Sequence, residues 1–506
     1  MTQEQKISNG VKNQNTFKTN IMLINCFSGN PVPPNTPPSG LLYVGSALQR
    51  AGYKVRILDR HLDIHQDVVS FGEKLLDGDH EIFGLGGVAS AYKDAVELAS
   101  YLKSRKPGCR IIAGGYLSPT AQCLLRKAPV DVVVRGEGEI TAVEVVNALS
   151  KGRPLDDIPG ITFLRDGVIV NTPNREQIVD LDEIPFPDYS LVEMERYLVP
   201  AYKAPYFRLD PRHKRYEGVL VDISTSRGCT NSCSFCYRHM RGIRQHSPKY
   251  VVKHMKYLQD TFKAVFFNIS DELTISDAGW VEGFCRTKKE MNLDCLFRIN
   301  SARVDLINER MLTELRDAGM VAITFGIESG SQKMLDNMHK RTTVEQNRRA
   351  LDICRKLDLQ TTVALVVGLP GENPFTVLET ARFLTTCPHY PDIKEYEYDD
   401  MNDIRIFTPI AFPGTLLYRQ GLELGIISDE HSYLWTLNDN KVMRSYNFSG
   451  YPDFVLKLWV YGLYFVYKMS YFWENREFRK MLGLLWKSAM GLLRLLRGSS
   501  VDNKNE

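Results

Sequence analysis

The chain contains no apolar N-terminal segment and no dense block of basic residues. Residues 1–20 are polar and rich in Asn, Gln, Lys and Thr, so they lack the apolar core of a signal peptide. We expect a disordered tail there and a cytoplasmic protein. The formal net charge of +3 neither favours nor excludes nucleic acid. No Lys/Arg run with interleaved aromatics and no RNA-binding module is recognisable, so no nucleic-acid partner is expected.

The sequence also lacks a disulfide framework and a dinucleotide-binding GxGxxG motif. Its ten cysteines are scattered apart from one triad, and none of the others forms a second complete metal-binding pattern. We expect the remaining seven to be buried or free thiols: Cys26, Cys109, Cys123, Cys285, Cys295, Cys354 and Cys387.

The triad is the most informative feature of the chain. Cys229, Cys233 and Cys236 form a CxxxCxxC pattern directly after the apolar stretch 219–223. Three thiolates without a fourth ligand leave one iron of an iron-sulfur cluster open. The alternatives are three ordinary thiols or a structural zinc site completed by His239. Zinc is disfavoured because all four ligands would share one short loop, with no second half-site elsewhere.

This pattern, with the aromatic Phe235 before its last cysteine, resembles the signature of the radical S-adenosylmethionine (radical SAM) enzymes. The resemblance implies that Cys229, Cys233 and Cys236 hold a 4Fe-4S cluster. It also implies that the amino and carboxylate groups of S-adenosylmethionine occupy the open iron, where reductive cleavage gives a 5′-deoxyadenosyl radical. A low-potential electron donor such as flavodoxin or ferredoxin is then an expected partner.

Residues 21–150 alternate short apolar runs with helical patterns, which is typical of a parallel, doubly wound sheet. The strands are predicted at 21–25, 54–58, 81–85, 110–113 and 131–134, and the helices at 40–50, 93–104, 120–125 and 140–149. Several strand ends are rich in glycine, which lets a ligand approach the backbone closely. Ordinary tight turns are the alternative interpretation of these glycines.

Three segments of this region resemble the cobalamin-binding domain of one large class of radical SAM enzymes: PPSGLLYV at 37–44, IIAGGY at 111–116 and VRGEGE at 134–139. The resemblance places cobalamin beside Ser90, Gly114, Gly115, Gly136 and Glu137. A run starting Asp59-Arg60-His61 is superficially similar to a cobalt-ligating DxHxxG motif, but it follows the second strand and lacks the glycine. We therefore interpret His61 as a polar loop residue and expect no protein histidine on cobalt.

Residues 151–217 are predicted to be a connecting segment with one hairpin around an Asp-Gly turn. Residues 218–425 again alternate strands and helices, with strands expected at 219–224, 264–268, 295–299, 321–327, 361–367 and 404–407. Helices are expected between them, for example at 308–317 and 344–357. Six such units suit a partial (β/α)6 barrel, whose active site lies at the carboxyl ends of the strands.

By the same resemblance, these strand ends carry the S-adenosylmethionine contacts. A carboxylate at Asp271 or Glu272 suits the ammonium group, and Arg303 suits the carboxylate. Glu328 and Ser329 are placed at the ribose, and the turn from Gly368 to Glu372 at the adenine. Phe235 completes the predicted set. The simpler alternative for each residue alone is a solvated charge at a strand end.

Residues 426–506 are predicted to be a helical C-terminal region. Residues 455–473 are apolar and aromatic but interrupted by lysines, too broken for a membrane span. Residues 479–497 form a basic amphipathic pattern. Such a helix either lies on a membrane surface or packs over the barrel, and both alternatives stay open. The acidic, aromatic run at 395–400 is expected to be an exposed loop.

Together these features predict an α/β protein with an N-terminal cobalamin-binding domain, a partial radical SAM barrel and a helical C-terminus. The leading functional hypothesis is methyl transfer from methylcobalamin to an unactivated carbon of a small molecule. A lipid or other apolar substrate would suit a membrane-surface position. An anaerobic oxidative cyclase or rearrangement enzyme of the same architecture is the alternative within the family. A cobalamin-binding sensor with a structural cluster is the alternative from another class.

Overall fold

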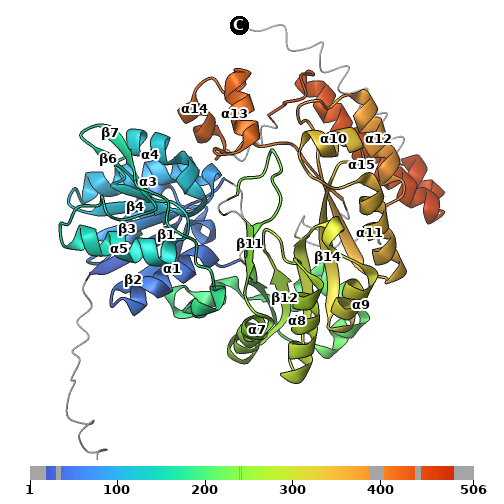
Figure 1. Cartoon of the computed structure of the whole chain (residues 1–506), viewed down its shortest axis with the longest axis horizontal. Helices are drawn as coiled ribbons and strands as arrows, with labels where there is room; N and C mark the ends of the chain where they lie inside the picture. Colours follow the sequence, from blue (N-terminus) through green and yellow to red (C-terminus); the bar gives the residue numbers. More distant parts are fainter. Residues whose placement is uncertain are drawn as a thin grey trace, which may run out of the picture.

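The computed structural model describes residues 19–29, 36–238, 240, 242–387, 404–438 and 446–483. Several predictions fall outside these residues: the tail up to residue 18, the zinc candidate His239, the acidic run at 395–400 and the helix pattern beyond residue 483. Two α/β units lie side by side, each built on its own sheet (Figure 1).

The first sheet has the strand order β2-β1-β3-β4-β5-β6-β7, and its first five strands are parallel. These five are β1 (Asn20–Asn25), β2 (Lys54–Asp59), β3 (Ile82–Gly86), β4 (Arg110–Gly114) and β5 (Val132–Val134). Strand β3 is buried at every position, as its continuous apolar run predicts for a strand covered on both faces. The doubly wound sheet predicted for residues 21–150 is confirmed.

Helices cover both faces of this sheet. Helices α1 (Ser39–Arg50) and α5 (Gly138–Ser150) pack together on one face. Helices α2 (Val68–Leu76), α3 (Tyr92–Arg105) and α4 (Ala121–Lys127) cover the other. The sequence analysis did not include α2, although Asp67 caps its N-terminus by accepting a hydrogen bond from the Ser70 amide.

The predicted hairpin consists of β6 (Ile161–Arg165) and β7 (Val168–Asn171), with Asp166 and Gly167 at its turn. Strand β6 pairs antiparallel with β5. The hairpin therefore extends the first sheet, whereas the sequence analysis placed it in the connecting segment. Its pairing partner is distant in the chain, and the local pattern contains no information about it.

The second sheet has the order β16-β15-β14-β13-β12-β9-β8, and its six longer strands are parallel. They are β9 (Val219–Ile223), β12 (Ala264–Ile269), β13 (Leu296–Ala302), β14 (Met320–Glu328), β15 (Gln360–Val366) and β16 (Ile404–Phe407). The short β8 (Val199–Pro200) pairs antiparallel with β9. All six predicted strands are present, which confirms the partial barrel.

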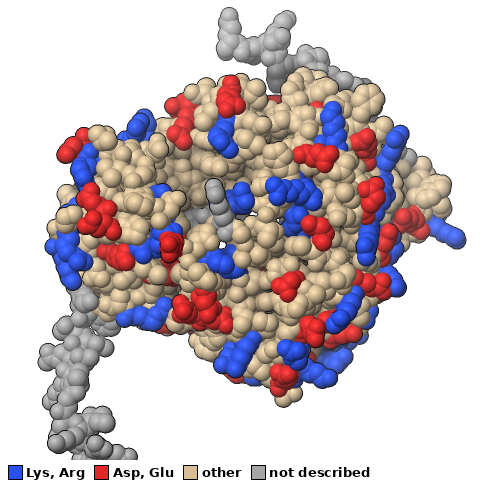
Figure 2. Space-filling view, viewed as in Figure 1, with Lys and Arg blue, Asp and Glu red and all other residues tan. Residues whose placement is uncertain are grey.

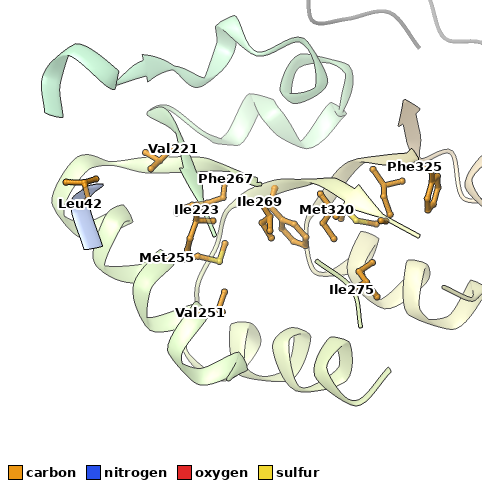
Figure 3. Packing of buried hydrophobic residues seen from close by; sticks show 14 of the residues in the cluster. Leu42, Val221, Ile223, Val251, Met255, Phe267, Ile269, Ile275, Met320 and Phe325 are labelled. Carbon is orange, nitrogen blue, oxygen red and sulfur yellow. The ribbon is translucent and has the colours of Figure 1, made fainter. Parts of the chain in front are cut away.

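Five helices cover the outside of this open barrel: α7 (Pro248–Phe262), α8 (Ala278–Glu290), α9 (Glu309–Asp317), α11 (Val344–Lys356) and α12 (Pro374–Leu384). Side chains of β9 and β12, such as Ile223 and Phe267, pack with Val251 and Met255 of α7 (Figure 3). The inner face is lined at its base by the short α6 (Pro205–Leu209), where Tyr206 hydrogen-bonds to Thr362 of β15 at 2.5 Å.

The C-terminal region contacts both units. Helices α13 (Leu416–Glu423) and α14 (Glu430–Thr436) lie over the first unit, and α14 packs on α3 (Figure 1). The Tyr92 hydroxyl lies 2.9 Å from His431 Nδ1, and Asn438 donates to the carbonyl oxygen of Ser90 at 3.0 Å. Helix α15 (Asp453–Glu474) packs on α12. Among the described residues, no helix has the length and apolarity that crossing a bilayer requires.

Candidate active site between the two sheets

The three cysteines lie on a hairpin at the carboxyl end of β9. Strand β10 (Ser226–Cys229) pairs antiparallel with β11 (Gly242–Gln245). Gly228 adopts φ +84°, and a Cβ there would stand 2.3 Å from the Gly242 carbonyl oxygen. Only glycine therefore lets the two strands approach this closely directly before Cys229.

Backbone hydrogen bonds anchor the loop between the cysteines. The Ser234 amide donates to the Met338 carbonyl oxygen at 3.0 Å, and the Leu417 amide donates to the Ser234 carbonyl oxygen at 2.9 Å. Asn231 Nδ2 donates to the Lys340 carbonyl oxygen at 2.8 Å and lies 3.0 Å from the Cys233 sulfur. The loop is thus held by the turn after α10 (Gln332–Asn337) and by the start of α13.

The thiols themselves are shielded from water to different degrees. Cys229 and Cys233 are half-buried, whereas the Cys236 residue is exposed. Loss of hydration around the sulfur atoms raises the pKa of the Cys233 thiol and raises the pKa of the Cys236 thiol to about 12, and the neighbouring cysteines raise both further. The protein alone therefore disfavours three thiolates, and bound cationic iron would reverse that preference. The other seven cysteines are free, and six of them are buried, as predicted.

Within the described residues, no group of three or more His, Cys, Asp or Glu side chains is arranged to hold a single metal ion. The thiols of Cys229, Cys233 and Cys236 nevertheless share one loop. They lie close enough for their charges to influence one another. Three thiols on one loop suit a 4Fe-4S cluster, because each cysteine of such a cluster binds a different iron.

The two acidic residues after β12 have different environments. The Asp271 carboxylate accepts from the Thr225 amide at 2.7 Å, the Thr225 hydroxyl at 2.5 Å and the Ser226 amide at 3.2 Å. Burial still raises its pKa to about 6. Glu272 accepts from the Tyr116 hydroxyl through Oε1, while its buried Oε2 has no hydrogen-bond partner. An unsatisfied carboxylate oxygen of this kind fits a cationic ligand group.

Arg303 and Glu328 are both engaged by neighbouring residues. Arg303 forms a bidentate pair with Asp305, with distances of 3.0 and 2.7 Å. Glu328 adopts φ +65° at the end of β14 and accepts from Lys340 Nζ at 2.8 Å. This Lys340 is buried and its pKa is raised despite burial, because Glu328 and Cys233 lie nearby. Sequence reasoning missed Lys340, since it lies on a turn twelve residues after Glu328.

The remaining predicted contacts occupy tight turns. Ser329 lies 3.0 Å from the Thr380 hydroxyl, and Glu372 accepts from Thr376 at 2.9 Å. Gly368 adopts φ +107°, and its amide points to Glu372 at 3.4 Å. Phe235 is partly buried against the apolar core. Their assignment to S-adenosylmethionine stays a prediction.

A cavity of about 580 Å³ lies between the two units. Its walls include the carboxyl ends of β1, β2, β3 and β4 on one side, and the start of the cysteine hairpin with Ser270, Asp271 and Glu272 on the other. Figure 2 shows that this face of the molecule is hollowed between the units. Residues from both sheets therefore contact one shared space.

A smaller apolar cavity of about 70 Å³ extends from the same sheet edge toward α1 and α5. Its wall includes Gly84, Gly86, Gly114, Gly115 and Gly138. A Cβ at Gly86 would stand 2.6 Å from a Leu41 methyl group, so side chains here would fill the groove. A glycine-lined cradle open to a larger cavity fits a bulky cofactor whose tail enters the sheet.

Of the five predicted cobalamin residues, Gly114, Gly115, Gly136 and Glu137 line the two cavities, whereas Ser90 lines neither. Gly115 and Gly136 border the large cavity with φ +67° and +78°. Glu137 also borders it, but its carboxylate accepts from Arg227 and Arg244 of the cysteine hairpin. The Ser90 carbonyl oxygen is bound by Asn438. Whether each residue contacts cobalamin stays a prediction.

His61 also borders the cavity, although the sequence analysis treated it as a loop residue. Its Nδ1 lies 3.1 Å from Asp59 Oδ1, and its Nε2 lies 3.1 Å from the Ser28 hydroxyl. Both ring nitrogens are thus engaged by protein groups. This is consistent with the expectation that His61 is not a cobalt ligand.

Comparison with known proteins agrees with this arrangement. A model of the radical SAM superfamily matches residues 223–384, and a model of the B12 binding domain matches residues 29–146. An uncharacterized methyltransferase of Pyrococcus horikoshii is 30% identical over 387 residues, which is 73% of this chain and 79% of that protein. An anaerobic magnesium-protoporphyrin IX monomethyl ester cyclase of Rubrivivax gelatinosus is 31% identical over 70% of this chain, but the match spans only 62% of the cyclase.

Solved structures share the fold. The cobalamin-dependent radical enzyme OxsB, with aqua-cobalamin and S-adenosylmethionine bound, superposes with a TM-score of 0.60 at 20% identity, covering 74% of this chain and 54% of OxsB. The radical SAM methyltransferase TsrM of Kitasatospora setae gives 0.59 at 18% identity, covering 80% and 76%.

A cysteine hairpin on a partial barrel, facing a glycine-lined sheet across one cavity, defines a radical SAM enzyme with a cobalamin-binding domain. The chain belongs to the cobalamin-binding radical SAM family. Its cofactors are a 4Fe-4S cluster, S-adenosylmethionine and cobalamin.

Proposed function

We propose that this enzyme is a C-methyltransferase that acts on an unactivated carbon of a small molecule. The observation that carries the proposal is the single cavity bordered both by the glycine-rich strand ends and by the cysteine hairpin. When bound there, the cofactors supply hydrogen abstraction from the substrate carbon and a methyl group for it. Relatives support methyl transfer, including the 30% identical Pyrococcus protein and a cytidylyl-2-hydroxyethylphosphonate methyltransferase of Streptomyces wedmorensis that is 25% identical.

In this proposal the residues of the barrel rim bind and orient S-adenosylmethionine. Glu272 accepts a hydrogen bond from the ammonium group of S-adenosylmethionine through the unpartnered Oε2, while the Tyr116 hydroxyl donates to Oε1. Asp271 acts one step further away, by fixing the turn that precedes the cysteine hairpin. Arg303 and Lys340 supply positive charge for the carboxylate of S-adenosylmethionine. Arg303 is held by Asp305, and Lys340 is held by Glu328. Burial of these groups excludes water from the reacting centre.

Incubation of the reconstituted enzyme with methyl-deuterated S-adenosylmethionine tests methyl transfer. The probe is a lipid and small-molecule extract of cells that lack the gene, under anaerobic reducing conditions. We expect a product that carries the deuterated methyl group and that a Cys233→Ala variant does not form. Consumption of a compound without incorporation of label would contradict the proposal.

The second candidate is an anaerobic oxidative cyclase. It is favoured by the cyclases of Rubrivivax gelatinosus and Cereibacter sphaeroides, which are 31% and 30% identical. The chain spans 62% and 65% of these proteins. Magnesium-protoporphyrin IX monomethyl ester added to the same reaction separates the candidates, because a cyclase would convert it without taking up label.

We also propose that the enzyme contacts a membrane surface through α15. One face of this helix packs on the barrel through Leu456, Leu463 and Tyr467. The opposite face exposes Phe454 and Tyr461, which are 64% and 71% accessible, and Leu458 lies between them. This spacing of four and three residues forms one apolar stripe.

Lysines such as Lys457 and Lys468 lie on the same helix and suit anionic lipid headgroups. A hopanoid C-3 methylase of Methylococcus capsulatus, 26% identical, supports an apolar substrate.

Flotation with vesicles of phosphatidylglycerol and phosphatidylcholine tests this contact. The variant Phe454→Ser/Leu458→Ser/Tyr461→Ser should remain in the dense fraction, whereas the wild type floats. Val179→Ser, which removes an apolar side chain that is 86% accessible in the connecting segment, is the matched control. Equal flotation of the wild type and the triple variant would discard the contact.

A further inference from the structure

Two arginines of the cysteine hairpin form ion pairs with two glutamates of the cobalamin-binding unit. Arg227 donates through Nη1 to Glu137 at 2.8 Å and through Nη2 to Glu139 at 2.6 Å. Arg244 Nη1 lies 3.0 Å from both carboxylate oxygens of Glu137. The glutamate side chains are only 5% and 10% accessible, and those of Arg227 and Arg244 are 21% and 14%. We call these four residues the Arg–Glu quartet.

The quartet joins the two cofactor sites by short paths. Glu137 is the N-cap of α5 and Glu139 lies in its first turn; they alternate with Gly136, which borders the large cavity, and Gly138, which lines the glycine cradle. On the other side, Arg227 lies two residues before Cys229, and Arg244 is its register partner on β11. Both strands of the cysteine hairpin are therefore bonded to the start of the helix that closes the cradle.

Additional contacts fix the orientation of these side chains. Glu137 Oε2 also accepts from the Ile178 amide at 2.8 Å. The Arg227 guanidinium lies over the Tyr43 ring, 5.4 Å from its centroid, which is within the distance of about 6 Å for a cation–π contact. One guanidinium that spans two carboxylates needs the planar fork of arginine, which lysine does not provide. Shielded ion pairs contribute little net stability because desolvation opposes the attraction, but they strongly restrict geometry.

We infer that the Arg–Glu quartet is a positioning device that sets the distance and orientation between bound cobalamin and the iron-sulfur cluster. The two cofactors must face one substrate carbon, and a small displacement of either would lower the reaction rate strongly. The two positive charges of the arginines balance the two negative charges of the glutamates, so the Arg–Glu quartet has no net charge. This inference rests on the cofactors of the family and not on methyl transfer, so it also holds for a cyclase.

The test measures cofactor geometry directly. The holoenzyme is prepared with a reduced cluster and cob(II)alamin, both of which are paramagnetic, and pulsed electron paramagnetic resonance records their magnetic interaction. We expect one defined separation in the wild type. Arg227→Gln, which removes both of its ion pairs, should broaden or abolish this defined interaction, and Arg227→Lys should restore it only in part.

A matched control separates positioning from general loss of stability. Arg212→Gln removes a half-buried ion pair with Asp210 at 2.6 Å that lies within the barrel unit. It should leave the magnetic interaction unchanged. If Arg227→Gln does not fold or load its cofactors, Glu139→Gln removes one arm of the bridge and decides the question in the same way. If the cofactor-loaded Arg227→Gln or Glu139→Gln variant shows the same magnetic interaction as the wild type, the inference is overturned.

Discussion

The two sides of the shared cavity differ in chemistry. On the first sheet, the strand ends present glycines such as Gly86, Gly115 and Gly136, several with positive φ. On the barrel, the strand ends carry charged residues: Glu272 borders the cavity, while Arg303 directly follows β13 and Glu328 ends β14. Cobalamin is large and needs room next to the backbone, whereas the zwitterionic amino-acid end of S-adenosylmethionine needs opposite charges at fixed positions. We therefore propose that cobalamin is recognised by shape on one side and S-adenosylmethionine by charge on the other.

Substitutions on the two sides of the cavity should have different effects. A side chain added on the first sheet should affect cobalamin alone, because it fills space. Removal of the charge of Glu272, Arg303 or Glu328 should affect S-adenosylmethionine alone, because it leaves the cradle intact. The cysteines stand apart from both groups, since without the cluster neither side has a reaction to support.

The largest effect is expected for Cys233→Ala. The loop is anchored by Ser234 and Asn231 and should keep its path, but the cluster loses one of its three ligands. We expect complete loss of S-adenosylmethionine cleavage, together with loss of bound iron measured by iron and sulfide analysis. Cys354→Ala, at a buried thiol on α11, is the control and should retain iron. Normal iron content and turnover in Cys233→Ala would remove the basis of the proposed chemistry.

The next largest effect is expected for Glu272→Gln. It removes a negative charge beside the cysteine loop and should weaken binding of S-adenosylmethionine roughly tenfold to hundredfold, the range for a hydrogen bond to a charged group. Equilibrium binding to the reconstituted enzyme measures this affinity, and cobalamin affinity should not change.

Asp271→Asn is the matched control for Glu272→Gln. Its carboxylate accepts three hydrogen bonds from Thr225 and Ser226, so the variant should lose folding stability more than affinity. If Asp271→Asn instead reduces affinity and Glu272→Gln does not, the assignment of the two carboxylates is reversed.

The sequence was sufficient to predict the parallel strands of both sheets, because buried parallel strands are continuous apolar runs that alternate with helical patterns. The spacing of Cys229, Cys233 and Cys236, with Phe235 before the last cysteine, also predicts the cluster ligands. The sequence did not reveal that Arg303 is paired with Asp305, that β6 joins the first sheet, or that Glu137 bonds to Arg227. These are contacts between side chains or strands whose partners are chosen by tertiary packing. A local pattern describes the residue but not its partner.

The comparison between the two sides of the cavity is sharpened by two glycines with similar backbone conformations. Gly115 lines the cradle with φ +67°, whereas Gly52 follows α1 with φ +87° and open space around its Cβ position. Alanine at either position should cost about 1–2 kcal/mol of folding stability, because the left-handed conformation is strained for any other residue. Only Gly115→Ala should also weaken cobalamin binding, measured by absorbance titration. Equal cobalamin affinity in both variants would show that the cradle does not hold the cofactor.

The last expected effect is one on folding stability and concerns Glu372, whose turn is predicted to lie at the adenine. Burial raises the pKa of this carboxyl to about 7, and its Thr376 and Gly368 partners only partly offset the increase. In the unfolded chain the pKa of the Glu372 carboxyl is about 4.5. Between this pKa and the folded-state pKa, the folded state therefore binds more protons than the unfolded state. Stability from this group is therefore present at low pH and falls as the pH rises toward 7.

Glu372→Gln should remove that dependence, because an amide resembles the protonated carboxyl. We expect the variant to match the wild type at about pH 5 and to exceed it by about 1–3 kcal/mol at about pH 8, measured by denaturant unfolding at both values. If S-adenosylmethionine affinity is unchanged, Glu372 shapes the turn without contacting the cofactor, and charge recognition on the barrel side is confined to the residues around the cysteine hairpin. A variant that is less stable than the wild type at both pH values would instead show that the ionised carboxylate stabilises the turn.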